Sequence, residues 1–169
     1  MKKLFVLLVA TLMVLPLFAQ TKEEKEAEAK ALYELAKDAV ESKDWIIIPT
    51  EITNAEGRVS DNNDASIFIV YEKTGEMYLQ GWSICGNSDT NFVEVKDYKV
   101  KYNKKGDITV MFSVLGRKVR GSYIIRIRHD GNQADVTFTP GTQEVTVKRF
   151  SGPLVRSGQA NYFKRSNAI

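Results

Sequence analysis

The feature that most constrains the fold is a series of short runs rich in Ile, Val, Tyr, Phe and Thr that begins at Trp45. Gly, Asn and Asp separate these runs, a pattern typical of β-strands joined by tight turns. Short links favour antiparallel pairing of neighbours in the sequence. The sequence therefore predicts a mainly β fold (α+β by count), an antiparallel meander of about eight strands that forms a curved sheet or a lipocalin-like barrel. The expected strands span Trp45 to Ile52, Ser66 to Glu72, Glu76 to Ile84, Phe92 to Tyr102, Asp107 to Leu115, Lys118 to His129, Asn132 to Phe138 and Glu144 to Phe150.

Alternation along the strands assigns their faces. Tyr123, Ile125 and Ile127 share one side with Val119, and basic side chains occupy the other side of the same strand. The runs Ile67 to Tyr71 and Ile46 to Ile48 are apolar on both sides, so we expect both faces of these strands to be covered, one of them by a helix. Asp130-Gly131 stands between two alternating runs and favours a two-residue type I′ turn.

The segment from Thr21 to Lys43 consists almost wholly of helix-forming Ala, Glu, Lys and Leu. Its apolar residues recur at three- and four-residue spacing, which predicts one amphipathic N-terminal helix that packs on the sheet. These residues are Ala29, Leu32, Leu35, Ala36, Ala39 and Val40. From Lys22 to Asp44 the chain carries five Lys against eight Asp or Glu, a net charge of −3.

The first residues have the pattern of a secretory signal. Lys2 and Lys3 precede an apolar run of about 15 residues that is shorter than a bilayer-spanning helix and ends at Ala19. We expect residues 1–19 to be a Sec-type signal peptide cleaved after Ala19, and residues 20–150 and 151–169 to be a single globular domain and a partly coiled tail. The expected location is periplasmic or extracellular, without a transmembrane span after processing. No cysteine follows the apolar run, so the chain is not expected to be a lipoprotein.

The second half of the chain resembles a family of secreted domains of unknown function that Gram-negative anaerobes carry in many copies. The resemblance extends from Phe92 to Leu154 and includes hydrophobic positions, turn glycines and a closing Phe-Ser-Gly. The positions that carry it are Asp97-Tyr98, Val100, Tyr102-Asn103, Lys104-Lys105, Val110, Phe112, Val114, Gly121 to Ile127, Gly131, Ala134, Val136 and Phe150-Ser151-Gly152. The resemblance implies an extracytoplasmic β-rich fold and no assigned activity.

The sequence offers little material for catalysis or metal binding. His129 is the only histidine, directly before a turn, and it predicts an exposed residue at a strand end rather than a zinc ligand. Cys85 is the only cysteine, which excludes an internal disulfide and favours a buried apolar role. Asp61-Asn62-Asn63-Asp64 lacks the glycine and distal glutamate of a calcium loop and is typical of a turn. We expect no catalytic residue, no metal, no cofactor and no enzymatic activity.

Two surfaces are candidate binding sites. Lys118, Arg120, Arg126 and Arg128 form a basic stripe that suits an anionic envelope component, and a solvated sheet face is the simpler interpretation. Tyr78, Gln80 and Trp82 share one strand face beside an open loop, where they could line a pocket mouth or pack in the core. The near-neutral mature chain is not expected to bind nucleic acid.

The hypothesis favoured by this pattern is a non-enzymatic binding module for an apolar or amphipathic ligand such as a lipid, because small secreted meanders often enclose one ligand. The alternative is an envelope interaction or structural protein that uses an exposed sheet face and has no ligand pocket. A cavity in the sheet would favour the first hypothesis, and a solid core with a surface patch would favour the second.

Overall fold

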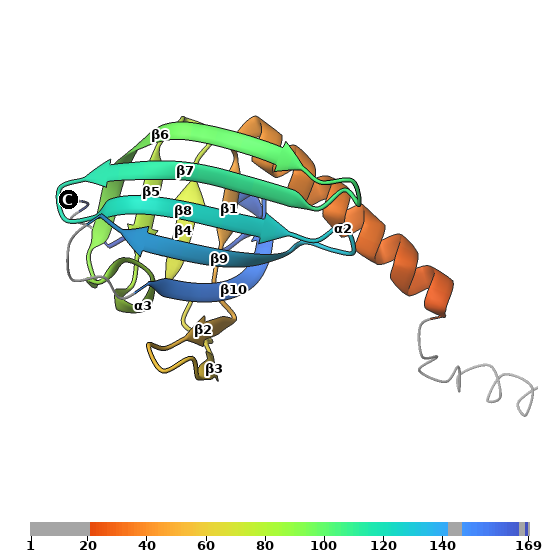
Figure 1. Ribbon diagram of the computed structural model, residues 1–169, viewed down its shortest axis with the longest axis horizontal. Coiled ribbons are helices and arrows are strands. Elements are labelled where there is room, and N and C mark those ends of the chain that lie inside the picture. The colour runs from red at the N-terminus through yellow and green to blue at the C-terminus, as the bar shows by residue number, and fades with distance from the viewer. Residues whose placement is uncertain (1–20, 142–146, 166–167, 169) are drawn as a thin grey trace, which may run out of the picture.

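The computed structural model describes residues 21–141, 147–165 and 168, and its sheet is a closed antiparallel barrel. The helices are α2 (Lys22–Ser42), the single turn α3 (Trp82–Cys85) and the 3₁₀ turn η1 (Ser157–Gln159). The strands are β1 (Trp45–Ile47), β2 (Glu51–Thr53), β3 (Val59–Asp61), β4 (Phe68–Tyr71), β5 (Met77–Gln80), β6 (Thr90–Tyr102), β7 (Ile108–Gly116), β8 (Arg120–Ile127), β9 (Gln133–Pro140) and β10 (Lys148–Val155). The predicted β-rich, barrel-like fold is therefore confirmed (Figure 1).

The barrel closes between its first and last strands. Strand order is β1-β4-β5-β6-β7-β8-β9-β10, and β10 returns to β1 through the pairs Ile46 with Val155 and Ile47 with Leu154. All pairings are antiparallel, so the strands from β4 to β10 form the predicted meander. Closure leaves the barrel itself without an edge.

Strands β2 and β3 form a short hairpin outside the barrel, below it in Figure 1. The prediction of one strand over Trp45 to Ile52 is wrong, because the chain bends after Ile47 and resumes as β2, which pairs with the first half of β10. Pro49 lies at the bend, where its missing N–H suits an interruption of the ladder. The run Val59–Asp61 carried no hydrophobic pattern, and all three of its residues are exposed.

Side chains fill the barrel interior. A row of stacked rings crosses it, with ring centroids 5.7 Å apart for Tyr98 and Phe112, 5.3 Å for Phe112 and Tyr123, and 4.5 Å for Tyr123 and Phe138. Trp45, fully buried, packs beside this row. The inward assignment of Tyr123, Ile125 and Ile127 is confirmed, since all three are fully buried.

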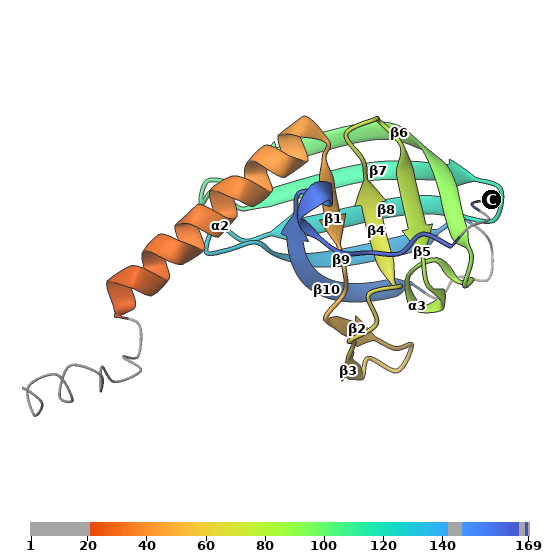
Figure 2. The same ribbon diagram turned by 180° about the vertical axis from the view of Figure 1, so that it is seen from behind.

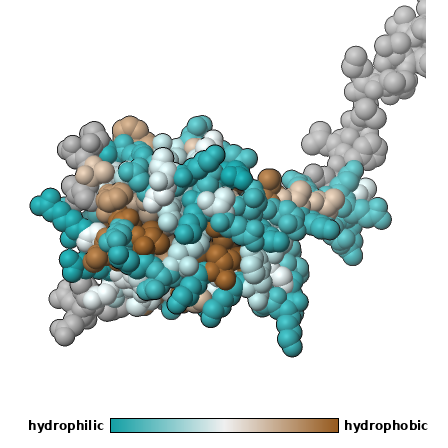
Figure 3. Space-filling model, turned by 90° about the horizontal axis from the view of Figure 1, so that it is seen from above, coloured by the Kyte–Doolittle hydropathy of each residue, from teal (hydrophilic) through white to brown (hydrophobic). Residues whose placement is uncertain are grey.

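Helix α2 closes one end of the barrel, called here the α2 end. Thr21 and Glu24 form a capping box at its start, and Ala36, Ala39 and Val40 near its finish are buried in the barrel core. The predicted docking of its apolar stripe holds for these three residues, whereas Leu32 and Leu35 are 37% and 50% exposed. The first half projects beyond the barrel (Figures 1 and 3).

The C-terminal segment covers the outer face of β1 and β4, where a helix was expected. Ile46, Phe68 and Val70 form a second apolar cluster on this face, beneath Val155, Ala160 and Tyr162. Figure 2 shows the segment after β10 crossing β4 and β5 on the outside of the barrel. We call residues 156–165 the strap. Both faces of these strands are covered as predicted, but the strap and not α2 supplies the outer cover.

Two expected boundaries also differ in the second half. Strand β10 continues to Val155, five residues into the expected tail, and residues 144–146 of its predicted start lie outside the described residues. The β8–β9 connection is longer than a two-residue turn, because the last pair of its ladder is Ile127 with Ala134. Neither Asp130 nor Gly131 has a positive φ, so the predicted type I′ turn is wrong.

Candidate ligand pocket at the α3 end of the barrel

The candidate site lies at the barrel end opposite α2, called here the α3 end. The end of β5, the turn between β7 and β8 and the end of β9 meet there, because alternate strand ends of an antiparallel barrel fall on the same side. A pocket of about 580 Å³ opens between them. Its lining residues are Trp82, Cys85, Gly86, Arg117, Lys118, Val119, Arg120, Phe138, Pro140 and Lys148.

The short helix α3 shapes one wall. The predicted strand Glu76 to Ile84 ends early at Gln80, because Gly81 has φ 122° and a Cβ atom there would lie 2.8 Å from Ile67 Cγ2. Gly86, with φ 80°, ends the turn in the left-handed region. The two glycines turn the chain across the barrel end and leave Trp82 69% exposed.

The floor of the pocket is apolar. Val119 and Phe138 are 2% and 3% exposed, and Phe138 is the last ring of the aromatic row in the interior. Cys85 lies beside them, with its Sγ 3.2 Å from the Gly81 carbonyl oxygen. Burial raises the pKa of this thiol to about 11. Phe138, at the end of the row of stacked rings, therefore forms the base of the pocket.

The rim of the pocket is basic. Arg117, Lys118, Arg120 and Lys148 line it, and Lys118 Nζ lies 2.8 Å from Asp89 Oδ2. Within the described part of the chain, no acidic side chain forms an ion pair with the other three. The pocket thus combines an apolar floor with cationic donors that match a carboxylate, sulfate or phosphate.

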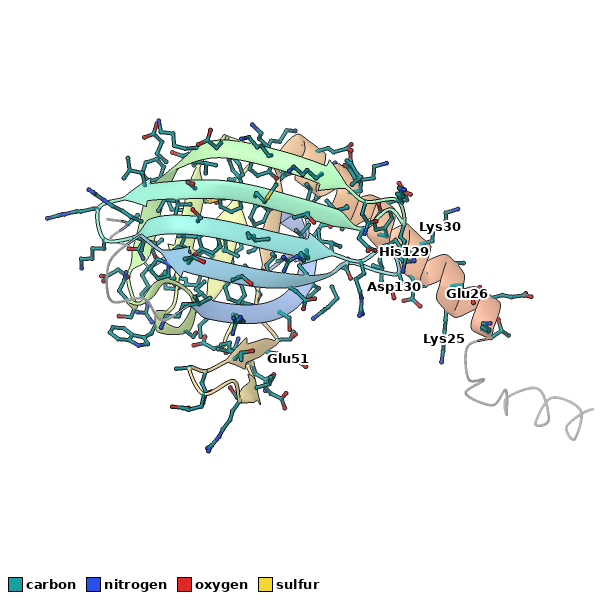
Figure 4. The ribbon with its side chains drawn as sticks, in the orientation of Figure 1. Lys25, Glu26, Lys30, Glu51, His129 and Asp130 are labelled. Carbon is teal, nitrogen blue, oxygen red and sulfur yellow. The ribbon has the colours of Figure 1, made fainter. Side chains whose placement is uncertain are left out.

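The four residues of the predicted basic stripe separate into two pairs. Lys118 and Arg120 lie at the pocket rim, whereas Arg126 and Arg128 belong to the α2 end. Arg128 Nε lies 3.3 Å from Asp130 Oδ1, and Arg126 pairs in the ladder with Asp135. In Figure 4, Asp130 lies beside α2, on the side of the barrel away from α3.

The structure also separates Tyr78 and Gln80 from Trp82. Tyr78 lies on the outer face of β5, with its ring 5.6 Å from that of Phe92 and 4.2 Å from Lys164 Nζ. The Gln80 amide is 1% exposed and donates to the carbonyl oxygens of Ser66, at 2.7 Å, and of Phe163, at 3.0 Å. These two residues hold the strap, and only Trp82 of the predicted set reaches the pocket.

Four residues that line the pocket were not predicted as site residues: Arg117, Val119, Phe138 and Lys148. The order of the predicted strands could have identified them. In a closed antiparallel meander, the turn that contains Arg117 and the start of the last strand at Lys148 lie at the same barrel end as Trp82.

The other candidate residues have structural partners. His129 is an exposed loop residue whose Nδ1 lies 2.7 Å from Asp107 Oδ1, and this contact lowers the pKa of Asp107 to about 2. Asn62 donates to the Pro49 carbonyl oxygen at 2.7 Å, and Asp64 accepts from the Ser66 N–H at 2.8 Å, as in an Asx turn. Among the described residues, no three His, Cys, Asp or Glu side chains gather as a metal site.

None of the helices within the described ranges combines the length and the apolar character needed to cross a membrane.

The sequence matches no family model, and no curated protein is similar to it. The structure is similar to the crystal structure of a DUF4251 family protein from Bacteroides eggerthii DSM 20697, with a TM-score of 0.68 and 20% sequence identity over 81% of this chain and 95% of that chain. At this identity the comparison shows that the two chains share a fold.

Proposed function

We propose that this protein is a secreted or periplasmic, non-enzymatic binding module that holds an amphipathic ligand with an anionic group in the pocket at the α3 end. The observation that carries the proposal is the pairing of a buried apolar floor, Val119 and Phe138, with a basic rim that includes Arg117 and Arg120. An apolar tail would contact the floor, while the anionic group would accept hydrogen bonds from the rim.

The size of the pocket fits this class of ligand. A volume of about 580 Å³ lies within the range of roughly 300–1,000 Å³ that small-molecule sites occupy. Aromatic side chains fill the barrel beneath it, so the ligand would lie across the barrel end and not along the barrel axis. A ligand with one short acyl chain therefore fits this pocket better than a lipid with several long chains.

The composition of the lining favours binding over catalysis. Apart from the basic residues, Cys85 is the titratable group among the described lining residues, and burial keeps its thiol protonated by raising its pKa to about 11. His129 and Asp107 form their contact in loops at the α2 end. General acid–base catalysis needs a titratable side chain such as His or Asp within hydrogen-bond distance of the bound molecule, and this contact lies at the other end of the barrel.

The rival hypothesis, an envelope protein that uses an exposed basic sheet face, receives less support. It needs one continuous stripe, whereas Arg126 and Arg128 lie at the other end of β8 from Lys118 and face Asp135 and Asp130. We also propose that the chain is a distant relative of the DUF4251 group, because the shared fold agrees with the resemblance in the second half of the sequence.

Fluorescence titration tests the ligand class. Trp45 is fully buried and Trp82 is 69% exposed, so acrylamide quenching reports on Trp82 at the pocket wall. We expect dodecyl phosphate and laurate, below their micellar concentrations, to shield Trp82 in a saturable manner. Dodecanol and dodecyltrimethylammonium should bind at least about tenfold more weakly, because they lack an acceptor for the rim.

Matched variants locate the site. Arg120→Gln should weaken laurate binding about tenfold, whereas Arg126→Gln, on the same strand but at the α2 end, should leave it unchanged. Equal affinity for all four head groups, or equal effects of the two variants, would refute the proposal. Native mass spectrometry of protein purified without detergent would then identify any natural ligand that remains bound.

A further inference from the structure

We propose that the α3 end of the barrel is a docking surface for an anionic lipid bilayer, with Trp82 and Phe163 at the level of the head groups. This inference goes beyond the pocket: it concerns the surface around the pocket mouth and holds whether or not a ligand occupies the pocket. It rests on the placement of four exposed apolar residues and on the arrangement of basic residues around them.

Four of the eight large apolar residues that are exposed among the described residues lie at this end, and the other four, Leu32, Leu35, Val59 and Tyr102, lie elsewhere. Among the described residues, Trp82, Phe92, Leu115 and Phe163 are 69%, 45%, 45% and 68% exposed. Trp82 follows β5, Phe92 stands near the start of β6, and Leu115 stands near the finish of β7, which places all three at the α3 end. Seen from above, apolar side chains reach the surface in the part of the barrel away from α2, and further apolar patches lie nearer its middle and on α2 (Figure 3).

Hydrogen bonds join the segments that carry these residues. The Phe163 carbonyl oxygen accepts from Gln80 at 3.0 Å, two residues before Trp82. The Arg165 N–H donates to Thr90 Oγ1 at 2.8 Å, and the Arg165 guanidinium donates to the carbonyl oxygen of Ser88. Asp89, the next residue, holds Lys118. The strap, the α3 loop and the β7–β8 turn therefore form one continuous surface.

The charge of this surface is basic. Arg117, Arg120 and Lys148 have no ion-pair partner within the described part of the chain. Of the carboxylates near this surface, Asp89 is paired with Lys118 and Glu94 with Lys96, while Asp64, beside Phe163, accepts a hydrogen bond from the Ser66 N–H. Each unpaired cation near an anionic bilayer adds roughly 1 kcal/mol of attraction.

The helix at the opposite end of the barrel is acidic. Residues Lys22 to Asp44, which include all of α2, carry a net charge of −3, and the first half of this helix projects away from the barrel. The neighbouring loops and strand ends add the cations of Lys104, Lys105, Arg126 and Arg128, so the negative charge belongs to the helix and not to the whole α2 end. Attraction to an anionic bilayer therefore depends on the residues of the α3 end itself.

A bilayer is the partner that uses both features. Stable attachment at a membrane surface generally takes two signals, such as inserted apolar side chains and a basic patch. Trp has a preference for the head-group layer because its ring is apolar and its N–H is polar. A soluble polyanion would engage Arg117 and Arg120 but would leave Trp82 and Phe163 in water.

Flotation with vesicles tests the docking surface. The full chain without residues 1–19 should float with vesicles of phosphatidylcholine and phosphatidylglycerol at a 7:3 ratio and stay behind with pure phosphatidylcholine. Brominated acyl chains should quench Trp82, whereas Trp45 is buried in the core and stays unquenched. The bound fraction should fall as the salt concentration rises.

Paired variants separate the two signals. Arg117→Gln with Arg120→Gln should lower the partition coefficient at least about tenfold, since each lost cation removes about a factor of five. Trp82→Ser with Phe163→Ser should lower it further and remove the bromine quenching. Arg126→Gln with Arg128→Gln makes the same change of charge at the α2 end and should have little effect.

The outcomes keep this inference distinct from the ligand proposal. Loss of laurate binding in Arg120→Gln together with undiminished flotation would overturn the docking surface alone. Flotation without saturable laurate binding would support docking and overturn the pocket proposal. Binding to heparin beads without flotation, or flotation that Trp82→Ser with Phe163→Ser leaves intact, would also overturn bilayer docking.

Discussion

Gly152 lies where the chain between β1 and β2 passes over β10, and no side chain fits there. A Cβ atom at Gly152 would stand 2.4 Å from the Ile48 carbonyl oxygen and 3.1 Å from Pro49 Cα. Both obstacles are backbone atoms, so neither can swing aside. We expect Gly152→Ala to lower the free energy of unfolding by about 2–4 kcal/mol, measured by urea denaturation.

Gly131→Ala is the matched control for this prediction. No atom lies within 4 Å of a Cβ built at Gly131, and its φ is not positive. The change should therefore alter stability by no more than about 0.5 kcal/mol. A large loss at Gly131 would restore the type I′ turn that the sequence suggested, and an unaffected Gly152→Ala variant would contradict the crossing described for β10.

The thiol of Cys85 should react slowly in the folded protein. Burial raises its pKa to about 11, so only about one molecule in a thousand carries the reactive thiolate at pH 8. We expect a thiol reagent such as Ellman's reagent to react at least about a hundredfold faster after unfolding in guanidinium. In the folded state the rate should rise about tenfold per pH unit between pH 8 and pH 10. A native rate equal to the unfolded one would show that the thiol is accessible.

At the scale of elements, the second half of α2 buries one side and exposes another. Val40 is fully buried at the end of the barrel, whereas Leu35, one turn and a residue earlier, is 50% exposed. We expect Val40→Ala to cost about 1–3 kcal/mol of unfolding free energy, because it leaves a cavity beneath the helix. Leu35→Ala should cost less than about 1 kcal/mol. Similar losses at both positions would mean that the Leu35 side chain also has a packed partner.

The sequence predicted elements well where one face is buried and failed where the chain changes direction. Alternation placed β7, β8 and β9 within a few residues, since one side of each faces the core. Strand β6 is harder to interpret, because a bulge at Asp97, with φ 55°, shifts the inward positions from Val95 to Tyr98. The β2–β3 hairpin escaped prediction because Ile52 alone of its β2 residues is an apolar side chain packed against the core, and all three residues of β3 are exposed.

Only some residues of the candidate site could be predicted from the sequence, because the chain changes direction at the site. Trp82 and the pair Lys118 and Arg120 were each identified from local pattern, but strand alternation placed them in different groups. Gly81 breaks the alternation before Trp82, so Trp82 no longer shares a face with Gln80. The set of residues around the pocket depends on which turns meet at one barrel end, and this is a property of closure and not of any single strand.

At the scale of the whole molecule, an ion pair fastens the strap to the start of the barrel. Arg156 Nη1 lies 3.1 Å from Asp44 Oδ2, and Ser157 Oγ donates to Asp44 Oδ1. Burial alone would raise the pKa of Asp44, yet these donors bring it below its ordinary value. Because the pKa is lower in the folded state, the contribution to stability is present above about pH 4 and is lost as the pH falls further.

Asp44→Asn should therefore lower the free energy of unfolding mainly at neutral pH. We expect it to cost about 1–3 kcal/mol of unfolding free energy at pH 7 and clearly less at pH 3, measured by urea denaturation at both values. Asp38→Asn is the control, because Asp38 also contacts Arg156 but its side chain is 61% exposed. It should cost less at pH 7, and an equal cost would mean that the contact with Asp44 has no special role.

The strap also protects the weakest join of the barrel. Strands β1 and β10 share two registered pairs, whereas β7 and β8 share eight, so the barrel should open first where it closes. Removing the chain after Val155 uncovers Ile46, Phe68 and Val70. We expect amide hydrogen exchange of Ile46 and Ile47 to speed up far more than that of Val110 and Ile125 in the long strands. Tyr162→Ala, which removes the ring that lies 5.0 Å from Phe68, should give a smaller change at the same amides. An equal increase in every strand would instead mean that the strap stabilises the barrel as one cooperative unit and that the β1–β10 join has no separate opening.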